Sequence, residues 1–481
     1  MASLNSSDPI IYGWKASDND RGTIDILWTC CITIVLCCWV STFPNAPSLS
    51  DKWYHQLLDK LNLAFMGFIG PEYLFALALN QLSSARNSIT LFRELHNENP
   101  QWNDKQWTLR HGFFADMGGF MLTSPDQPAF PINAQQLHYL IAHGHVEYPE
   151  ITKEDIDQRN KTDGLAKLIT LWQVVWFVVA EMQRVRLGLP LTTFEVTALS
   201  FSFTMIITSV FWYYKPTIST PTKISTKGGK TIAEIRASAR QRTHPHLPNT
   251  WFRTPLDFIS RRQMAITTHW SYYVEILKRL NIPLAGRKIK TRPWDRFPST
   301  AFPETFHSIQ WPGFLVPVGC CVAFLAPWNF YFATETEQFL WRLCSVYHTA
   351  FASYVAGYVM YSMLNVKESR ASRTYTGFPE IGEGAHNDEE VLQSGGTDRV
   401  QVPWYRRLAL RISRRLQRLR NISEDGDPDM EMKLRQVVLF GIGAALYCLC
   451  RIFFYVENFV AMRSQPAQVY IGVNKFIPFL P

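Results

Sequence analysis

The chain has 481 residues, of which 47% are hydrophobic and 14% aromatic, and its formal net charge is +8 at pH 7. Its mean hydropathy lies near zero because long polar stretches alternate with apolar runs of about twenty residues, the length that a helix needs to cross a bilayer. All nine cysteines lie in the apolar runs. This placement argues against a disulfide-stapled exterior and against a zinc site in a polar loop.

The apolar runs predict an all-α integral membrane protein with about seven transmembrane helices and large, partly helical cytosolic loops. The polar first segment has no basic stretch followed by an apolar core, so the first run is expected to act as an uncleaved signal anchor. In chain order, the expected helices are residues 24–43, 62–82, 165–182, 196–214, 314–333, 339–364 and 437–462.

These helices divide the chain into alternating membrane and polar regions. The expected regions are a polar N-terminal segment (1–23), helices 1 and 2 (24–82), a histidine-containing polar loop (83–164), helices 3 and 4 (165–214), a basic loop (215–313), helices 5 and 6 (314–364), a linker with an Arg-rich amphipathic helix (365–436), helix 7 (437–462) and a tail (463–481). Helices 3 and 4 are separated by a short turn with Pro190, which indicates a helical hairpin.

Charge predicts the orientation of the loops. Residues 215–313 carry 17 Lys and Arg against 5 Asp and Glu, a net of +12, which favours the cytosolic side. With seven crossings, the three large loops and the amino terminus share that side and the carboxyl tail faces the other. The glycosylation sequons at Asn5, Asn160 and Asn421 are then expected to be unmodified.

Residues 403–421 contain apolar side chains at helical spacing, with arginines filling the other positions. Such a helix can lie at the membrane surface with its guanidinium groups on anionic lipid head groups, or it can dock on the protein's own loops. The preceding residues, Glu380 to Asp398, are acidic and almost free of large apolar groups, which predicts a disordered linker.

Glu72 is the strongest candidate for intramembrane chemistry, because it follows Pro71 in the middle of the second expected span. Ionisable groups are costly in lipid and are kept there for partners, substrates or protons. The later spans carry Arg342, His348, Arg451 and Glu457. We expect an ion pair from Glu72 to Arg451 or Arg342, which can serve assembly alone or a polar site.

The loop after the second span holds a second group of candidates, His111, Asp116, His138 and His143, with His145 and Glu147 close in sequence. Imidazole and carboxylate are ligands of zinc and iron, but the spacing is not that of HExxH or of two histidines four apart. A structural cluster is therefore the preferred interpretation. No metal site is predicted, and the cofactor is unknown.

Several motifs are absent, namely the GxxxxGK[ST] phosphate loop, the GxSxG elbow, the GxGxxG turn and HExxH. Common ATP-driven, hydrolytic and redox classes therefore become less favoured. The charge of the basic loop is explained by cytosolic sidedness, so no nucleic acid is expected as a partner.

Several blocks, in order, carry a family resemblance: RGTIDILWTC, LRHGFFADMGGF, INAQQLHYLIAHG, KTDGLAKLITLWQVVWFVV, WNFYFATETEQFLWR and LYCLCRIFFYVENFVAMRS. They resemble a group of fungal multi-pass membrane proteins, some of them linked to secondary-metabolite gene clusters. The resemblance covers most of the chain. It implies a fungal source and an organelle or plasma membrane, such as the endoplasmic reticulum, without implying a reaction.

The resemblance places His111, Asp116, His138 and His143 at the group's positions. The chain departs from the pattern where many members carry a histidine and a cysteine, since it has Phe324 and Leu325 there. The role of that histidine therefore does not transfer to this chain.

The leading functional hypothesis is an accessory or tailoring component in the biosynthesis of a lipophilic metabolite, with Glu72 or the histidine loop in acid–base roles. One alternative is a transporter or exporter whose polar path is lined by Glu72, Arg342 and Arg451. Another is a membrane scaffold or receptor-like interaction protein that uses residues 215–313 and the arginine helix. The expected partners are the lipid bilayer and a lipophilic small molecule.

Overall fold

The computed structural model describes residues 11–17, 21–102, 105–160, 164–260, 265–280, 282, 286–302, 311–372, 420–422, 427 and 431–472. Its elements are β1 (Ile11–Tyr12), α1 (Thr23–Val40), α2 (Trp53–Ile69), α3 (Pro71–Glu98), η1 (Pro100–Trp102), α4 (Leu109–Asp116), β2 (Phe120–Thr123), β3 (Phe130–Ile132), α5 (Ala134–Ala142), α6 (Lys153–Arg159), α7 (Gly164–Arg186), α8 (Thr193–Phe211), β4 (Thr222–Ser225), η2 (Lys227–Gly229), α9 (Ile232–Arg242), α10 (Asp257–Ser260), α11 (Ala265–Arg279), α12 (Trp311–Val322), η4 (Ala323–Asn329), α13 (Glu335–Ser372), α16 (Leu434–Val460), η6 (Ala461–Arg463), β5 (Gln465–Pro466) and η7 (Ala467–Tyr470).

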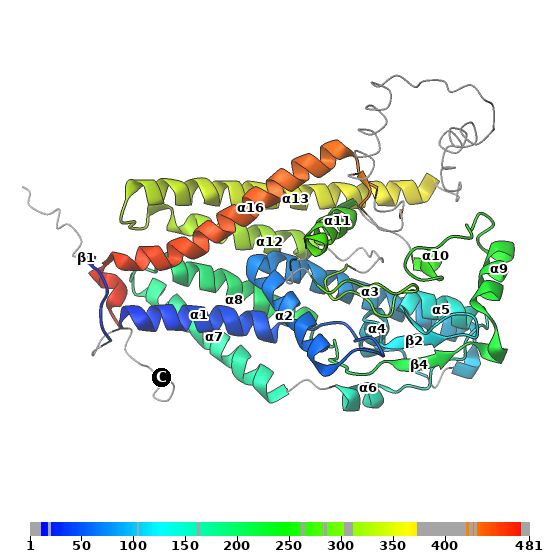
Figure 1. The fold of residues 1–481 in the computed structure, drawn as a ribbon. Coiled ribbons are helices and arrows are strands. Elements are labelled where there is room, and N and C mark those ends of the chain that lie inside the picture. The colour runs from blue at the N-terminus through cyan, green and yellow to red at the C-terminus, as the bar shows by residue number, and fades with distance from the viewer. Residues whose placement is uncertain are drawn as a thin grey trace, which may run out of the picture.

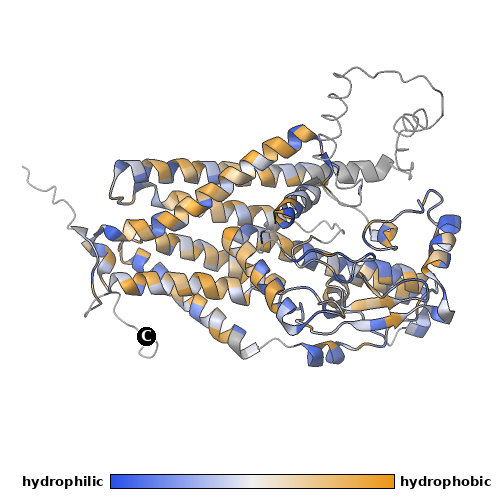
Figure 2. Cartoon of the chain, viewed as in Figure 1, coloured by the Kyte–Doolittle hydropathy of each residue, from blue (hydrophilic) through white to orange (hydrophobic). Residues whose placement is uncertain are grey.

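The molecule has an apolar helical bundle and a polar domain at one end of it (Figure 1). The bundle contains α1, α7, α8, α12, α13 and α16, and the polar domain contains α4, α5, α9 and a small sheet. Hydrophobic residues follow the bundle helices along their length, whereas hydrophilic residues gather on the polar domain (Figure 2). The mosaic of the sequence is therefore a separation in space.

Four helices of the described chain are long and apolar enough to cross a membrane. They are α1, α7, α8 and α16, and the number rises to five when the bent pair α2–α3 counts as one span. The stretch 313–329, which contains most of α12 and η4, is apolar but shorter. The expected seven spans are not confirmed, although each expected run does contain helix.

The second expected span is not one straight helix. Helix α2 ends at Ile69, α3 begins at Pro71, and the two are bent by 120° at this break. Proline is tolerated in the first turn of a helix, because its missing N–H has no partner there, so the break falls where the sequence places it. Helix α3 then continues to Glu98, into the region expected to be a polar loop.

The two ends of the described chain meet at the end of the bundle far from the polar domain (Figure 1). Strand β1 pairs antiparallel with β5, in the register Ile11 to Pro466. The Thr23 hydroxyl donates to the Tyr470 hydroxyl over 3.2 Å. The expectation that the amino-terminal and carboxyl-terminal segments lie on opposite sides is therefore wrong, because one crossing was counted in the bent pair.

The polar domain joins two regions that the sequence presents as separate loops, and its sheet departs from an all-α fold. Its sheet has the order β3-β2-β4, with β2 parallel to β4. Its core consists of Phe114, Phe120, Phe130, Leu137 and Ile232, all buried. Residues from 83–164 and from 215–313 thus bury one hydrophobic surface together, which neither stretch provides alone.

Buried Lys215 connects the domain to the bundle. Its ammonium donates to the Phe43 carbonyl at 2.7 Å, to Asn45 Oδ1 at 3.1 Å and to Gln81 Oε1 at 2.9 Å. Burial lowers the pKa of this lysine to about 7. Three oxygen acceptors compensate the removal of the amine from water, so this contact ties the ends of α1, α3 and α8 together.

Three sequence features fall wholly or mostly outside the described residues: Asn5, the linker at 380–398 and the arginine helix at 403–421. Two sequons are described. The Asn160 side-chain oxygen accepts from the Thr217 backbone N–H at 2.9 Å, and the Asn421 amide donates to the Asp427 carbonyl at 2.8 Å. Both asparagines therefore have a local structural role.

Candidate functional site

Glu72 lies in the first turn of α3, immediately after the bend. Helix N-termini carry partial positive charge, which favours a carboxylate at this position. The side chain points into the bundle and only 8% of the residue is exposed. The break at Gly70 and Pro71 thus places a carboxylate in the interior, between α3, α12 and α16.

The expected ion pair between Glu72 and Arg451 is present. An Arg451 Nη2 donates to Glu72 Oε1, and the same nitrogen donates to the Tyr447 hydroxyl at 2.9 Å. The guanidinium also lies 5.0 Å from the ring centre of Phe324. Arg451 is fully buried, so the pair replaces water around both charges.

Arg342, the other expected partner, does not reach Glu72. Its Nε donates to the Trp328 carbonyl at 2.9 Å, and the guanidinium lies over the Trp328 ring. This contact is exposed, beyond η4 at the start of α13. The structure therefore separates Arg342 from the interior cluster.

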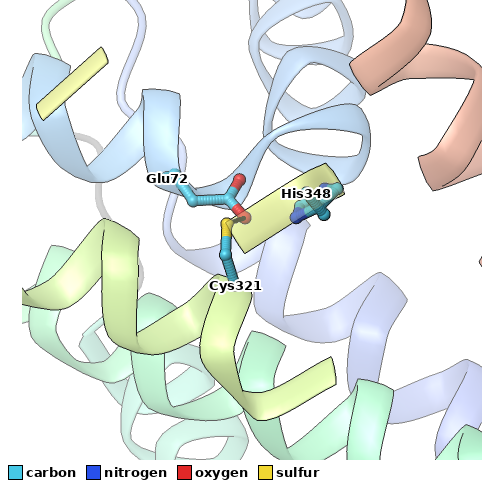
Figure 3. A group of neighbouring side chains, drawn as sticks. All are labelled: Glu72, Cys321 and His348. Carbon is cyan, nitrogen blue, oxygen red and sulfur yellow. Dashed lines mark hydrogen bonds between the residues drawn. The ribbon is translucent and has the colours of Figure 1, made fainter. Parts of the chain in front are cut away.

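Two cysteines and a histidine complete the cluster around Glu72. The thiols of Cys320 and Cys321 lie 3.5 Å and 3.6 Å from Glu72 Oε1. His348, on α13, stacks on Tyr447 with ring centres 4.2 Å apart. Figure 3 shows Glu72, Cys321 and His348 converging from three helices, and their donor atoms lie within 4.8 Å of one another.

Several polar atoms of the cluster have no hydrogen-bond partner among the described residues. They are Glu72 Oε2, both ring nitrogens of His348, and Nε and Nη1 of Arg451. Buried polar groups in folded proteins are nearly always hydrogen bonded, so an unpaired group needs a further partner such as water or a ligand. The cluster therefore has capacity for a polar group from outside the chain.

The donor set of carboxylate, thiol and imidazole matches the ligands of zinc. Arg451 argues against a metal here, because its positive charge already neutralises Glu72. A second positive charge about 4 Å away costs about 4 kcal/mol per unit charge at an effective dielectric constant of about 20. The balance of charge favours proton transfer or hydrogen bonding over metal coordination, and no metal is assigned.

The histidine loop does not form one site. His111 closes the first turn of α4, with Nδ1 2.8 Å from the Thr108 hydroxyl and Nε2 3.0 Å from the Ile151 carbonyl. His138 lies edge-on to Phe92, with ring centres 5.6 Å apart. His143 stacks on Tyr139 at 4.0 Å. These three positions are structural in their contacts, and none lies in the cluster of Glu72.

Asp116 differs from the histidines because it lines a cavity. Its Oδ1 accepts from the Ala134 backbone N–H at 3.0 Å, which ties the end of α4 to the start of α5. Burial raises the pKa of Asp116 to about 6. Glu72 and Asp116 thus belong to two separate polar places, one in the bundle and one where the domain joins it.

Sequence reasoning named Glu72, Arg451 and His348 but treated the cysteines as filler and missed Tyr447. One signal was present, since Tyr447 and Arg451 are four residues apart and so share one face of α16. The positions of Cys320 and Cys321 depend on how α12 packs against α3, which has no local signal.

Residues 1–240 match the model of a family described as a family of unknown function (DUF8562). The similarity covers just under half of the chain and includes Glu72 and the histidine loop, but not α12, α13 or α16. No curated protein matches the chain. No solved structure matches it.

Proposed function

We propose that this chain is a polytopic membrane protein that acts on a lipophilic small molecule at the interior cluster of Glu72, His348 and Arg451. It serves as an accessory or tailoring component in the biosynthesis of a lipophilic metabolite. The observation that carries the proposal is the unpaired His348, which is completely buried with both ring nitrogens lacking a partner. A buried ionisable group in an apolar bundle is costly, and such groups mark functional sites in membrane proteins.

The proposed topology has six crossings, by α1, α7, α8, α12 with η4, α13 and α16, together with a re-entrant pair α2–α3. Strands β1 and β5 then lie on one side and the polar domain on the other. The +12 charge of residues 215–313 favours the cytosol for the domain. A re-entrant pair also explains how the first turn of α3 is held inside the bundle.

Helix α2 supports the re-entrant arrangement through its exposed face. Trp53, Tyr54, Leu57, Leu58 and Leu61 are all exposed and recur at helical spacing. The opposite face carries Asp59, which is clamped by Arg287 at 2.9 Å. An apolar outer face beside a polar inner face is typical of a helix that lies in the membrane interface.

The chemistry proposed for the cluster is general acid–base catalysis on a substrate that enters from the bilayer. His348 is the proton-transferring group, because neither ring nitrogen has a partner in the bundle. Glu72 holds Arg451 in place through Oε1 and keeps Oε2 for the substrate. Such a group contributes typically 10²–10⁴-fold to a rate when it lies within hydrogen-bond reach of the reacting atom.

The proposal is tested by comparing metabolites of a strain that lacks the gene with strains that express defined variants at equal protein amounts. His348→Phe keeps the ring that stacks on Tyr447 but removes both nitrogens. Arg342→Ala is the matched control, because Arg342 lies outside the cluster. We expect His348→Phe to reproduce the metabolite loss of the deletion and Arg342→Ala to behave as the wild type.

The second candidate, a transporter, is favoured by the broken helix at Glu72, since broken helices with inward N-termini form transporter sites. Its expected path through Arg342 is not formed, which counts against it. Product retained in cells and missing from the medium identifies a transporter. Unchanged metabolites in cells and medium reject both functions and leave the scaffold hypothesis.

A further inference from the structure

A second polar cavity lies between the polar domain and the domain end of α3. Its volume is about 70 Å³, which is room for several water molecules. Side chains from distant parts of the chain line it, including Asn45, Gln81, Asp116, Gln136, Arg253 and Trp294. Small-molecule sites are commonly cavities at such junctions, with a few convergent polar groups.

Two buried polar atoms of the lining have no partner among the described residues. One is Asp116 Oδ2, an acceptor, and the other is Trp294 Nε1, a donor. The remaining groups are well connected, as Gln136 shows: its amide donates to the Leu256 carbonyl and to the Ser260 hydroxyl, both at 3.2 Å. The cavity therefore lacks one donor and one acceptor, and a single ligand can supply both.

The charges of the lining select the sign of the ligand. Asp116 and Asp257 are opposed by Arg253, which gives the lining a net charge of −1. Asp257 is already engaged, because Oδ1 accepts from Thr254 N at 2.9 Å and Oδ2 from Arg253 N at 2.8 Å. The charge that needs a partner is therefore that of Asp116, so a cationic ligand is favoured over an anion.

A hard metal ion fits this lining poorly. Calcium takes six to eight oxygen ligands and magnesium needs octahedral geometry, whereas the cavity offers one carboxylate oxygen without a partner. The Trp294 N–H is a donor and repels a cation. A protonated amine meets both constraints, because it donates to a carboxylate, and an oxygen on the same molecule accepts from the indole.

We infer that this cavity binds a small primary amine that also carries a hydroxyl group, a ligand of the amino alcohol class. The ammonium donates to Asp116 Oδ2 and the hydroxyl oxygen accepts from Trp294 Nε1. The site is separate from the cluster of Glu72 and does not depend on the function proposed for it.

The test measures thermal unfolding of the full-length protein in detergent micelles at pH 7.5, with four probes of similar size. They are ethanolamine, ethylene glycol, glycolate and glycine. We expect ethanolamine to raise the Tm by a few degrees with saturation in the millimolar range, while ethylene glycol and glycolate have no saturable effect. No response to ethanolamine, or a larger response to glycine or glycolate, overturns the inference.

Variants distinguish loss of binding from loss of folding. Asp116→Asn is expected to abolish the ethanolamine response and to raise the Tm of the unliganded protein, because burial raises the pKa of Asp116 and its charged form is costly at pH 7.5. Trp294→Phe is expected to weaken the response at least fivefold. Glu98→Gln, on an exposed residue at the end of α3, is the control for charge. A full response in Asp116→Asn also overturns the inference.

Discussion

Arg451 and Glu72 form a buried ion pair across 379 residues of sequence, joining the last helix of the bundle to the first turn after its only described 120° bend. Removing one member of such a pair leaves an uncompensated charge in the interior. Removing both leaves apolar side chains that can pack. The first prediction follows from this difference.

Glu72→Met and Arg451→Met are each expected to cost about 3–5 kcal/mol of unfolding free energy, whereas the double variant recovers most of that loss. Thermal and denaturant unfolding of the four proteins in micelles measures the cycle. Additive losses would show that the two charges are not coupled. The double variant is expected to be stable and still lack the metabolite activity, which separates folding from function.

The arrangement of the chain ends predicts the outcome of epitope mapping. Tags placed before Met1 and after Pro481 are expected to respond alike to protease in sealed membranes. A tag inserted in the exposed turn at Gly228 is expected to respond in the opposite way, because β1 and β5 lie at the far end of the bundle from η2. Seven crossings would instead give two ends with opposite responses.

The contact between α3 and α4 predicts a strong effect of a small substitution. A Cβ added at Gly112 would lie 2.6 Å from Ser88 Oγ and 2.9 Å from the Ala85 carbonyl. Ser88 is held in place by Trp107, whose Nε1 donates to its hydroxyl at 2.9 Å. We expect Gly112→Ala to lower the unfolding free energy by about 1–3 kcal/mol.

The matched control is Gly357→Ala, within α13, where nothing lies within 4 Å of an added Cβ. Alanine favours a helix over glycine by about 1 kcal/mol, so this variant should be neutral or slightly more stable. Equal losses in both variants would show that the α3–α4 contact is not tight. Denaturant unfolding monitored by circular dichroism measures both.

Acid is expected to destabilise the polar domain. Burial lowers the pKa of His111 and of His145 below 6.5, so these rings are neutral in the folded state. The unfolded chain binds more protons between pH 6.5 and the lower folded pKa, and stability is therefore lost as the pH falls through this range. Protonated Asp116 opposes this trend below about pH 6.

The measurement is the Tm between pH 7.5 and 5.5. His145→Phe is expected to flatten the dependence, since both nitrogens of His145 are buried without a partner. His246→Phe, at an exposed loop position, is expected to leave it unchanged. A wild-type Tm that rises as the pH falls would contradict the assignment of neutral histidines.

Local features of the fold follow from the sequence because their causes are local. An apolar run such as 24–43 carries its own length and hydropathy, and α1 is found there. Pro71 marks a helix start for a similar reason. The angle of the bend was not predictable, since it depends on packing of α3 against α8 and α12. The same holds for the pairing of β2 with β4 across a hundred residues.

The candidate site was predictable only in part. Costly groups in apolar runs identified Glu72 and Arg451, because the penalty for a charge in lipid is a property of each residue alone. Cys321 and Trp294 carry no such penalty, so their place in a site depends on neighbours from other helices. The histidines were grouped by sequence proximity, but the turns between α4 and α5 point their rings in different directions.

The pairing of β1 with β5 also constrains how the protein is made. During synthesis Ile11 and Thr23 emerge first, whereas their partners Pro466 and Tyr470 emerge more than four hundred residues later. The bundle therefore stays open at this end until translation is almost complete. A ribosome that stalls before β5 releases a chain with a free strand edge, which is a feature that quality-control factors of the membrane can recognise.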